Sequence, residues 1–327
     1  MARLRAVRVE QFAPWLVGIV AFGTAVWAAQ PYPVGVFHDD GVYITLAKSL
    51  ATGEGYRYLN QPGTPVATHY PPAYPLLLAA LWKLAPNFPR NIPILQLANA
   101  IALGLAAWAA MTFARRTLGW TQPAAIVGVV VGTLSYPLLG LSVYLLSAPL
   151  FAALLLPSLI FAERVAAAAN TGLVMATVLG LGGARAETRA YQEQSWHQPG
   201  QRAARGAGPL ILWVESKTRP EDVIAVESEQ LVYLFTGRRA LPPQAFTAAE
   251  YVRPTSIKST TESLRRMLSE FPVTYIVTGD PQVLRAARVL SDSAASPGLR
   301  ARLVPIDGPR NGGAFRVERR DSSTINP

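Results

Sequence analysis

The sequence predicts a polytopic α-helical membrane protein of about five spans with a C-terminal extracytoplasmic α/β domain. Half of the 327 residues are hydrophobic and only 15% are charged, whereas a soluble protein carries about 25% charged residues. The long apolar runs fall in residues 1–183, and most of the charge falls in residues 184–327. The composition therefore divides the chain into a transmembrane region and a soluble region.

The first expected span is 13–29, about 17 residues without a charge, which is near the lower limit for crossing a bilayer. Three arginines precede it. A cleavable signal peptide is the alternative, because small residues follow the apolar run at Ala28 and Ala29. We prefer a retained helix because further apolar segments follow.

The remaining spans are expected at 92–114, as a pair within 123–162, and at 171–183. The pair is predicted because Tyr136-Pro137 interrupts a long uncharged stretch, which indicates a tight turn. Basic residues mark cytoplasmic ends, so the N-terminus is placed in the cytoplasm of a multi-pass plasma-membrane protein. The loop 30–90 and the C-terminal domain are then extracytoplasmic.

Two short helices are expected in or after the outer loop. Apolar residues recur at helical spacing in 41–51, which predicts an interfacial helix. The apolar run that follows Pro75 has about 10 residues, too few to span a bilayer, so we expect it to be interfacial or re-entrant.

The soluble region divides into a polar linker at 184–208, an α/β domain at 209–320 and a tail at 321–327. Strand-like and helix-like segments alternate within the domain, which indicates a small mixed sheet. The expected strands are 222–227, 273–278, 303–306 and 314–318, and the expected helices are 210–217, 230–235, 260–271 and 281–290.

Composition also excludes several kinds of chemistry. The chain contains no cysteine, so it has no disulfide, no thiolate metal site and no cysteine nucleophile. It contains neither a P-loop nor a GxGxxG motif. The net charge of +10 is compatible with nucleic acid or with an anionic membrane surface. The apolar spans favour the membrane, and no nucleic-acid partner is predicted.

The adjacent carboxyl groups of Asp39 and Asp40 are the first candidate for chemistry. Neighbouring carboxylates repel, which can raise the pKa of one of them and suit it to act as a general base. They could also bind a divalent cation, the one cofactor considered. An Asp-Asp-Gly sequence is, however, more often a turn or a helix cap.

Three segments of the outer loop resemble a known family. They are Phe-His-Asp-Asp-Gly-Val-Tyr at 37–43, AKSLATGEGY at 47–56 and YPPAYPLLLA at 70–79. Their order resembles the first outer loop of GT-C type glycosyltransferases, in particular the bacterial protein-mannosyltransferase and aminoarabinose-transferase-like proteins. The resemblance implies an inverting transferase that moves a sugar from a polyprenyl-phosphate carrier to a hydroxyl or amine acceptor.

The resemblance places Asp39 and Asp40 at the catalytic centre, with Asp40 favoured because it precedes the glycine. His38 is not a motif residue and is given no role beyond lining the loop. Lys48 and Arg57 are candidates for holding the donor phosphate, with lipid headgroups as the more common partners of such side chains. The candidate sugar-binding tyrosines are Tyr43, Tyr70 and Tyr74, although tyrosines in such a position more often form an interfacial aromatic belt.

Two departures weaken the resemblance. Ala148 stands where such enzymes usually have a glutamate, in the segment Tyr-Leu-Leu-Ser-Ala-Pro at 144–149. Many of the expected central spans are also missing, so a partner subunit that supplies them is one alternative. Another is a non-catalytic, membrane-anchored α/β module for binding or assembly, and a third is a carrier or regulator of lipid-linked sugars.

Overall fold

The computed structural model describes residues 2–165, 192, 197–244, 256–292, 301–310 and 312–319. It divides into two compact units. The helical unit comprises Met1–Tyr32 and Pro71–Arg202, and the loop–sheet unit comprises Pro33–Tyr70 and Ala203–Pro327. Each unit is described separately below. The outer loop, which we expected to belong to the transmembrane region, thus packs for most of its length with the C-terminal domain.

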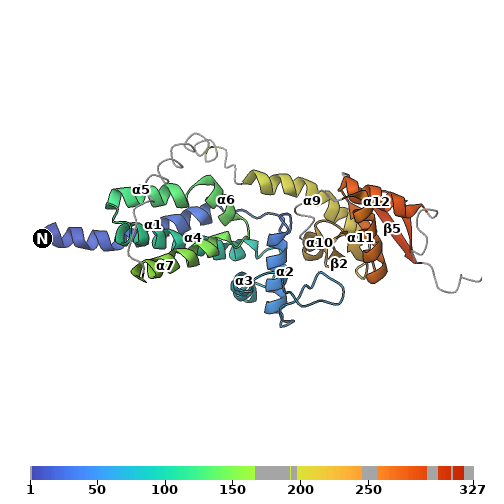
Figure 1. Cartoon of the computed structure of the whole chain (residues 1–327), viewed down its shortest axis with the longest axis horizontal. Coiled ribbons are helices and arrows are strands. Elements are labelled where there is room, and N and C mark those ends of the chain that lie inside the picture. The colour runs from blue at the N-terminus through green and yellow to red at the C-terminus, as the bar shows by residue number, and fades with distance from the viewer. Residues whose placement is uncertain are drawn as a thin grey trace, which may run out of the picture. The chain divides into compact units, whose positions relative to one another are not determined.

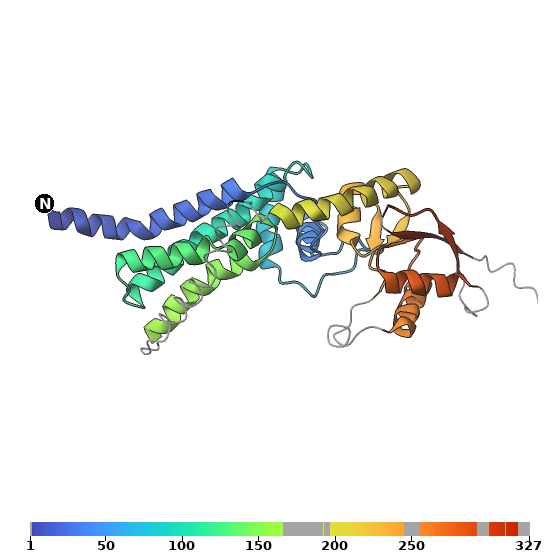
Figure 2. The ribbon, with the colours of Figure 1, turned by 90° about the horizontal axis from the view of Figure 1, so that it is seen from above.

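Apolar helices that lie side by side build the helical unit (Figure 2). Helix α4 is central and packs against α1 and α7, and small residues permit the closest approach. A Cβ on Gly18 would lie 2.8 Å from the carbonyl oxygen of Gly104, so the two glycines let α1 and α4 touch along their backbones. The helices are α1 (Ala2–Ala28), α3 (Ala73–Leu84), α4 (Ile92–Arg116), α5 (Gln122–Thr133), α6 (Tyr136–Val143) and α7 (Ala148–Val165).

One helix of the described residues, α4, is long and apolar enough to cross a membrane. Helices α5 and α6 reach that length only together, and they are bent by 53° at their junction. The expected turn at Tyr136-Pro137 is therefore a bend, because the proline occupies the first turn of α6, where its missing N–H is tolerated. The chain breaks again at 144–147 before α7. The expected last span, 171–183, lies outside the described residues.

The loop–sheet unit contains a mixed sheet, of which Figure 1 labels β2 and β5, and its five strands lie in the order β2-β1-β3-β5-β4. Strand β1 pairs in parallel with β2 and β3, and β5 pairs antiparallel with β3 and β4. The strands are β1 (Val223–Ala225), β2 (Arg239–Leu241), β3 (Tyr275–Thr278), β4 (Ala301–Ile306) and β5 (Gly313–Arg319). The helices of this unit are α2 (Asp39–Ala51), α10 (Glu229–Thr236), α11 (Ile257–Glu270) and α12 (Pro281–Ser291), with most of α9 (Gln198–Lys217).

Both faces of the sheet are covered because neighbouring residues of β1 point to opposite sides. Val223 and Ala225 pack with side chains of α11 and α12, whereas Ile224 packs with Trp213 of α9 and Val232 of α10. The four predicted strands and the α/β class of this domain are confirmed. The predicted linker is wrong over its last residues, since α9 already begins at Gln198.

Candidate functional site

The candidate site lies where the outer loop enters α2. The backbone of His38 has φ 62° and ψ −66°, and Asp39 N–H donates to the carbonyl oxygen of Phe37 over 2.8 Å. These values describe a γ-turn of the rare, strained form. A strained residue persists only where its surroundings hold it, and such residues concentrate at functional sites. The turn ends directly at the two aspartates, which form the first turn of α2.

Asp40 is the residue that holds this turn. Its side chain is fully buried, with 0% exposure. Its two carboxylate oxygens accept hydrogen bonds from the backbone N–H groups of Gly35, at 2.9 Å, and Phe37, at 3.1 Å. The negative charge also lies at the N-terminus of α2, where the helix dipole favours it. Asp40, the favoured reacting carboxylate of the sequence analysis, is thus buried and hydrogen-bonded to the backbone of the loop.

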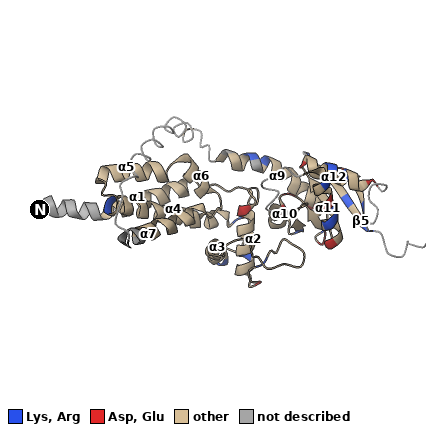
Figure 3. Ribbon diagram, viewed as in Figure 1, with Lys and Arg blue, Asp and Glu red and all other residues tan. Residues whose placement is uncertain are grey.

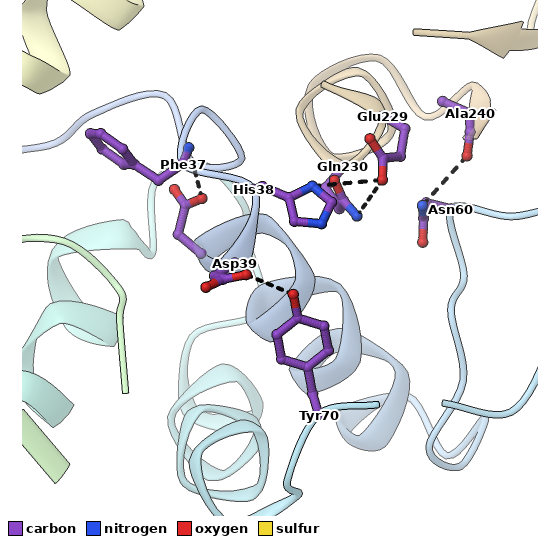
Figure 4. A network of polar contacts seen from close by, with 9 residues as sticks. Phe37, His38, Asp39, Asn60, Tyr70, Glu229, Gln230 and Ala240 are labelled. Carbon is purple, nitrogen blue, oxygen red and sulfur yellow. Dashed lines mark hydrogen bonds and ion pairs between the residues drawn. The ribbon is translucent and has the colours of Figure 1, made fainter. Parts of the chain in front are cut away.

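Asp39 has the opposite environment, although it is the adjacent residue. It is exposed, and its Oδ1 accepts a hydrogen bond of 2.6 Å from the Tyr70 hydroxyl (Figure 4). The Tyr70 ring packs edge-on against Tyr43 with 5.4 Å between the ring centroids. Burial and, secondarily, the hydrogen bond to Asp39 raise the pKa of Tyr70, so its hydroxyl remains a donor. The predicted residues Asp39, Tyr43 and Tyr70 are thus brought together.

A third acidic residue, Glu229, lies beside this group and was not among the predicted site residues. It begins α10, directly after strand β1, and is only 2% exposed. Its Oε1 lies 3.8 Å from Nδ1 of His38 and accepts a hydrogen bond of 2.8 Å from the Gln230 side chain (Figure 4). Burial, aided by the negative charge of Glu227, raises the pKa of Glu229 to about 7.

His38, expected only to line the loop, therefore has a defined partner. Burial lowers the pKa of its imidazole, and the negative charge of Asp39 opposes that shift. No local pattern links His38 to Glu229, because 191 positions of sequence separate them. The only available signal was chemical: an acidic residue directly after a buried strand, at the edge where α/β sheets bind ligands.

Close backbone contacts hold the loop against α10. A Cβ on Gly35 would lie 2.6 Å from the backbone nitrogen of Leu231, and a Cβ on Gly41 would lie 2.6 Å from Cβ of Gln230. Gly35 also has φ 101°, a conformation that favours glycine. Further along, the backbone N–H of Ala240 donates to the carbonyl oxygen of Asn60 over 2.7 Å.

The other predicted binding residues lie apart from Asp39. Lys48 is engaged with Tyr233 of α10, donating to its hydroxyl over 3.3 Å with the ammonium 4.7 Å from the ring centroid. Arg57 donates to the carbonyl oxygen of Thr64 within the loop. Tyr74 belongs to the helical unit, where it is buried and donates to the side chain of Asn99.

A metal site at Asp39 and Asp40 is not favoured by this geometry. The backbone N–H groups already occupy both oxygens of Asp40. Within the described ranges, no group of three or more His, Asp or Glu side chains is arranged to hold a metal ion.

Comparisons with models of known protein families, with curated proteins and with solved structures gave no match to this chain.

Proposed function

We propose that this chain is a membrane glycosyltransferase that moves a sugar from a polyprenyl-phosphate carrier to a hydroxyl or amine acceptor. Asp39 would act as the general base. The proposal rests on the different environments of the two adjacent carboxylates. Asp40 is buried and fixed by two backbone N–H groups, which leaves Asp39 exposed and oriented by Tyr70.

In this reaction the acceptor oxygen or nitrogen attacks C1 of the sugar, and the bond from C1 to the carrier phosphate breaks. The polyprenyl phosphate leaves with the bonding electron pair. The acceptor proton passes to the carboxylate of Asp39, which must be within hydrogen-bond reach of the acceptor. The hydroxyl of Tyr70 holds the carboxylate in position without competing as a base, since its raised pKa keeps it protonated.

A membrane setting is supported by the surface of the helical unit. Large apolar side chains are exposed along its helices, including Trp15 and Leu16 on α1 and Phe151 and Leu154 on α7. Contiguous apolar surface of this kind indicates contact with lipid or with another protein. The loop that carries Asp39 leaves this unit after α1 and returns before α3, so apolar helices flank it in sequence. The proposal therefore places the reaction at the membrane surface on the extracytoplasmic side.

The experiment is transfer from radiolabelled polyprenyl-phosphate sugars in membranes that contain the chain, with Asp39→Asn, Asp40→Asn and Glu54→Gln. Glu54 supplies a matched control because it is an exposed carboxylate of the same unit, after the end of α2. We expect Asp39→Asn to abolish transfer while the chain stays folded, and Glu54→Gln to leave transfer unchanged.

Asp40→Asn should instead destabilise the loop–sheet unit, because the amide replaces one of two carboxylate acceptors with a donor facing a backbone N–H. The fluorescence of Trp213, the one tryptophan in the sequence of that unit, reports this when the other six tryptophans of the chain are replaced by phenylalanine. An Asp39→Asn variant that transfers at the wild-type rate would exclude Asp39 as the base.

The second candidate function is a non-catalytic, membrane-anchored binding module. It is favoured by Ala148, the first residue of α7, which removes a carboxylate that the resembled enzymes carry. Folded, inserted protein that transfers no sugar from any donor would support this module and overturn the transferase.

A further inference from the structure

The carboxyl group of Glu229 is unusual among the buried groups of the described residues. Its Oε2 is inaccessible to solvent and has no hydrogen-bond partner. A buried, unsatisfied carboxyl oxygen is costly, and its presence calls for a physical reason. The residue also forms the first turn of a short helix, so neither packing nor capping of a long helix accounts for it.

The position of Glu229 in the sheet gives one reason. After β1 the chain runs through α10 to β2 on one side, and after β2 it returns through α11 to β3 on the other side of β1. The carboxyl end of β1 is therefore a topological switch point, the place where open α/β sheets bind ligands. Glu229 lies at this end, and the γ-turn of His38 lies against it.

The His38 side chain is oriented toward Glu229. Figure 4 shows the His38 imidazole pointing from the start of α2 toward Glu229, with Asp39 on the adjacent turn of the chain. The 3.8 Å between Nδ1 and Oε1 is within ion-pair range and longer than a hydrogen bond. Acid–base contacts of this kind are often long in the free protein and shorten when substrate binds. The close approaches at Gly35 and Gly41 fix the loop, and with it the imidazole, against α10.

We propose that His38 and Glu229 form a proton-holding pair that receives the acceptor proton from Asp39 and so restores the base after each transfer. This inference rests on the proposed transferase function. The proton released by the acceptor first binds Asp39. It then reaches the imidazole through solvent, since both side chains are exposed, and the carboxylate of Glu229 compensates the positive charge. The imidazolium, which is half exposed, finally releases the proton to water. Glu229 acts through His38 and is a positioning residue in this scheme.

Burial shifts both groups toward their neutral forms, because it raises the pKa of Glu229 to about 7 and lowers that of His38 from 6.5. The charged neighbours are Asp39, which raises the pKa of His38, and Glu227, which raises that of Glu229. The Gln230 amide lowers the pKa of Glu229 by donating to it.

The first test needs no activity. The chain contains only three histidines, so ring-nitrogen NMR of histidine-labelled, detergent-solubilised full-length protein can follow each imidazole against pH. Substitution of His38 by Gln assigns its signal. We expect the His38 signal to titrate in two steps in the wild type and in one step in Glu229→Gln. The midpoint of the His38 titration should differ between the two proteins by about one pH unit.

Glu221→Gln is the matched control, because Glu221 is an exposed glutamate just before β1. This substitution should change neither step of the His38 titration. A His38 titration that is identical in the wild type and in Glu229→Gln would overturn the pair, whatever the transfer assay shows.

The second test compares transfer with stability. Loss of the pair should lower transfer in Glu229→Gln by about 10²-fold near neutral pH and change the pH profile. The same variant should be more stable than the wild type at pH 8, because it removes a buried charge. If Glu229 only supported the fold, its substitution would lower the stability and the transfer activity of the protein together. Glu229→Asp, which retains a carboxyl group, should recover part of the transfer.

The two proposals fail in different ways. A coupled titration of His38 in a wild-type protein that transfers no sugar overturns the transferase and, with it, the role of the pair in the reaction. A coupled titration in a protein whose Glu229→Gln variant transfers at the wild-type rate at every pH overturns the role of the pair and leaves Asp39 as the base.

Discussion

The two units of this chain both bury apolar side chains, but they expose different kinds of surface. In the described residues, nearly all exposed large apolar side chains belong to the helical unit, and the exceptions are Val66, Leu212, Ile257 and Val289. Charged residues are sparse on α4–α7 and frequent on α11, α12 and β5 (Figure 3). The described surface of the helical unit is therefore richer in large apolar side chains, and that of the loop–sheet unit is richer in charge.

The helix ends differ only in part between the units, because α2 and α10 of the loop–sheet unit also lack a side-chain cap and α12 also begins with a proline. In the loop–sheet unit, α11 and α12 begin with side-chain caps, from Ser256 to the N–H of Ser259 and from Asp280 to the N–H groups of Gln282 and Val283. In the helical unit, α3 to α6 have no side-chain cap, and α4, α5 and α6 begin with a proline in the first turn. The outer loop belongs to the loop–sheet unit, where His38 lies against Glu229 of α10.

The largest expected effect concerns the attachment of the loop. Gly35→Ala should lower the free energy of unfolding of the loop–sheet unit by about 4 kcal/mol, because it combines a strained φ with overlap on the Leu231 backbone. Gly53→Ala, which also has a positive φ but meets nothing within 4 Å, should cost only about 1 kcal/mol. Urea unfolding followed by Trp213 fluorescence compares them. Equal losses would show that the loop is not held by this contact.

The second prediction tests the apolar surface of the helical unit. Leu154→Lys on α7 should cost about 3 kcal/mol if that face lies in lipid, the cost of a lysine near the centre of a spanning helix. Ile257→Lys, at an exposed site of the loop–sheet unit, should change stability by less than about 0.5 kcal/mol. Membrane insertion measured by glycosylation mapping distinguishes them. Efficient insertion of both variants would argue that α7 faces water.

Local patterns in the sequence were sufficient for most of the sheet. The run at 273–278 is rich in β-branched residues and forms β3, and Gly237 ends α10 in the left-handed conformation expected of a helix terminator. Strand β2 was missed because its three residues, Arg-Ala-Leu, include no β-branched side chain, whereas the equally short β1, Val-Ile-Ala, contains two.

The site could be predicted only in part, for a related reason. The sequence identified Asp39 and Asp40 but not which of them is accessible, because that depends on a γ-turn at His38 that no local propensity favours. It missed Glu229 because the contact joins segments far apart in the chain. Non-local contacts of this kind depend on how whole elements pack.

The third prediction uses the pKa of Glu229. The unfolded chain releases this proton near pH 4.5, whereas the folded chain holds it to about pH 7. Between these values the folded state binds more protons, so this group's contribution to stability falls as the pH rises from 4.5 to 7, by about 3 kcal/mol in total. His38 acts in the opposite direction, since its lowered pKa costs stability as the pH falls below 6.5.

Comparison of the wild type with Glu229→Gln isolates the carboxyl group. The difference in unfolding free energy should favour the variant at pH 8 and shrink toward zero near pH 4.5. The measurement is urea unfolding at both pH values, followed by Trp213 fluorescence. A constant difference between the two would show that Glu229 has an ordinary pKa in the folded protein and would also weaken the case for a proton-holding pair.

The smallest predicted change in stability concerns the N-terminal caps of the helices. Ser256→Ala removes the side-chain acceptor from the N–H of Ser259, so α11 should lose about 1 kcal/mol. Thr121→Ala at the start of α5 is the matched change in the helical unit, where the side chain makes no capping hydrogen bond. We expect it to cost a few tenths of a kcal/mol at most. Chemical denaturation of the two variants measures the difference. Equal losses of stability in the two variants would mean that the start of α5 depends on its N-cap side chain as much as the start of α11 does.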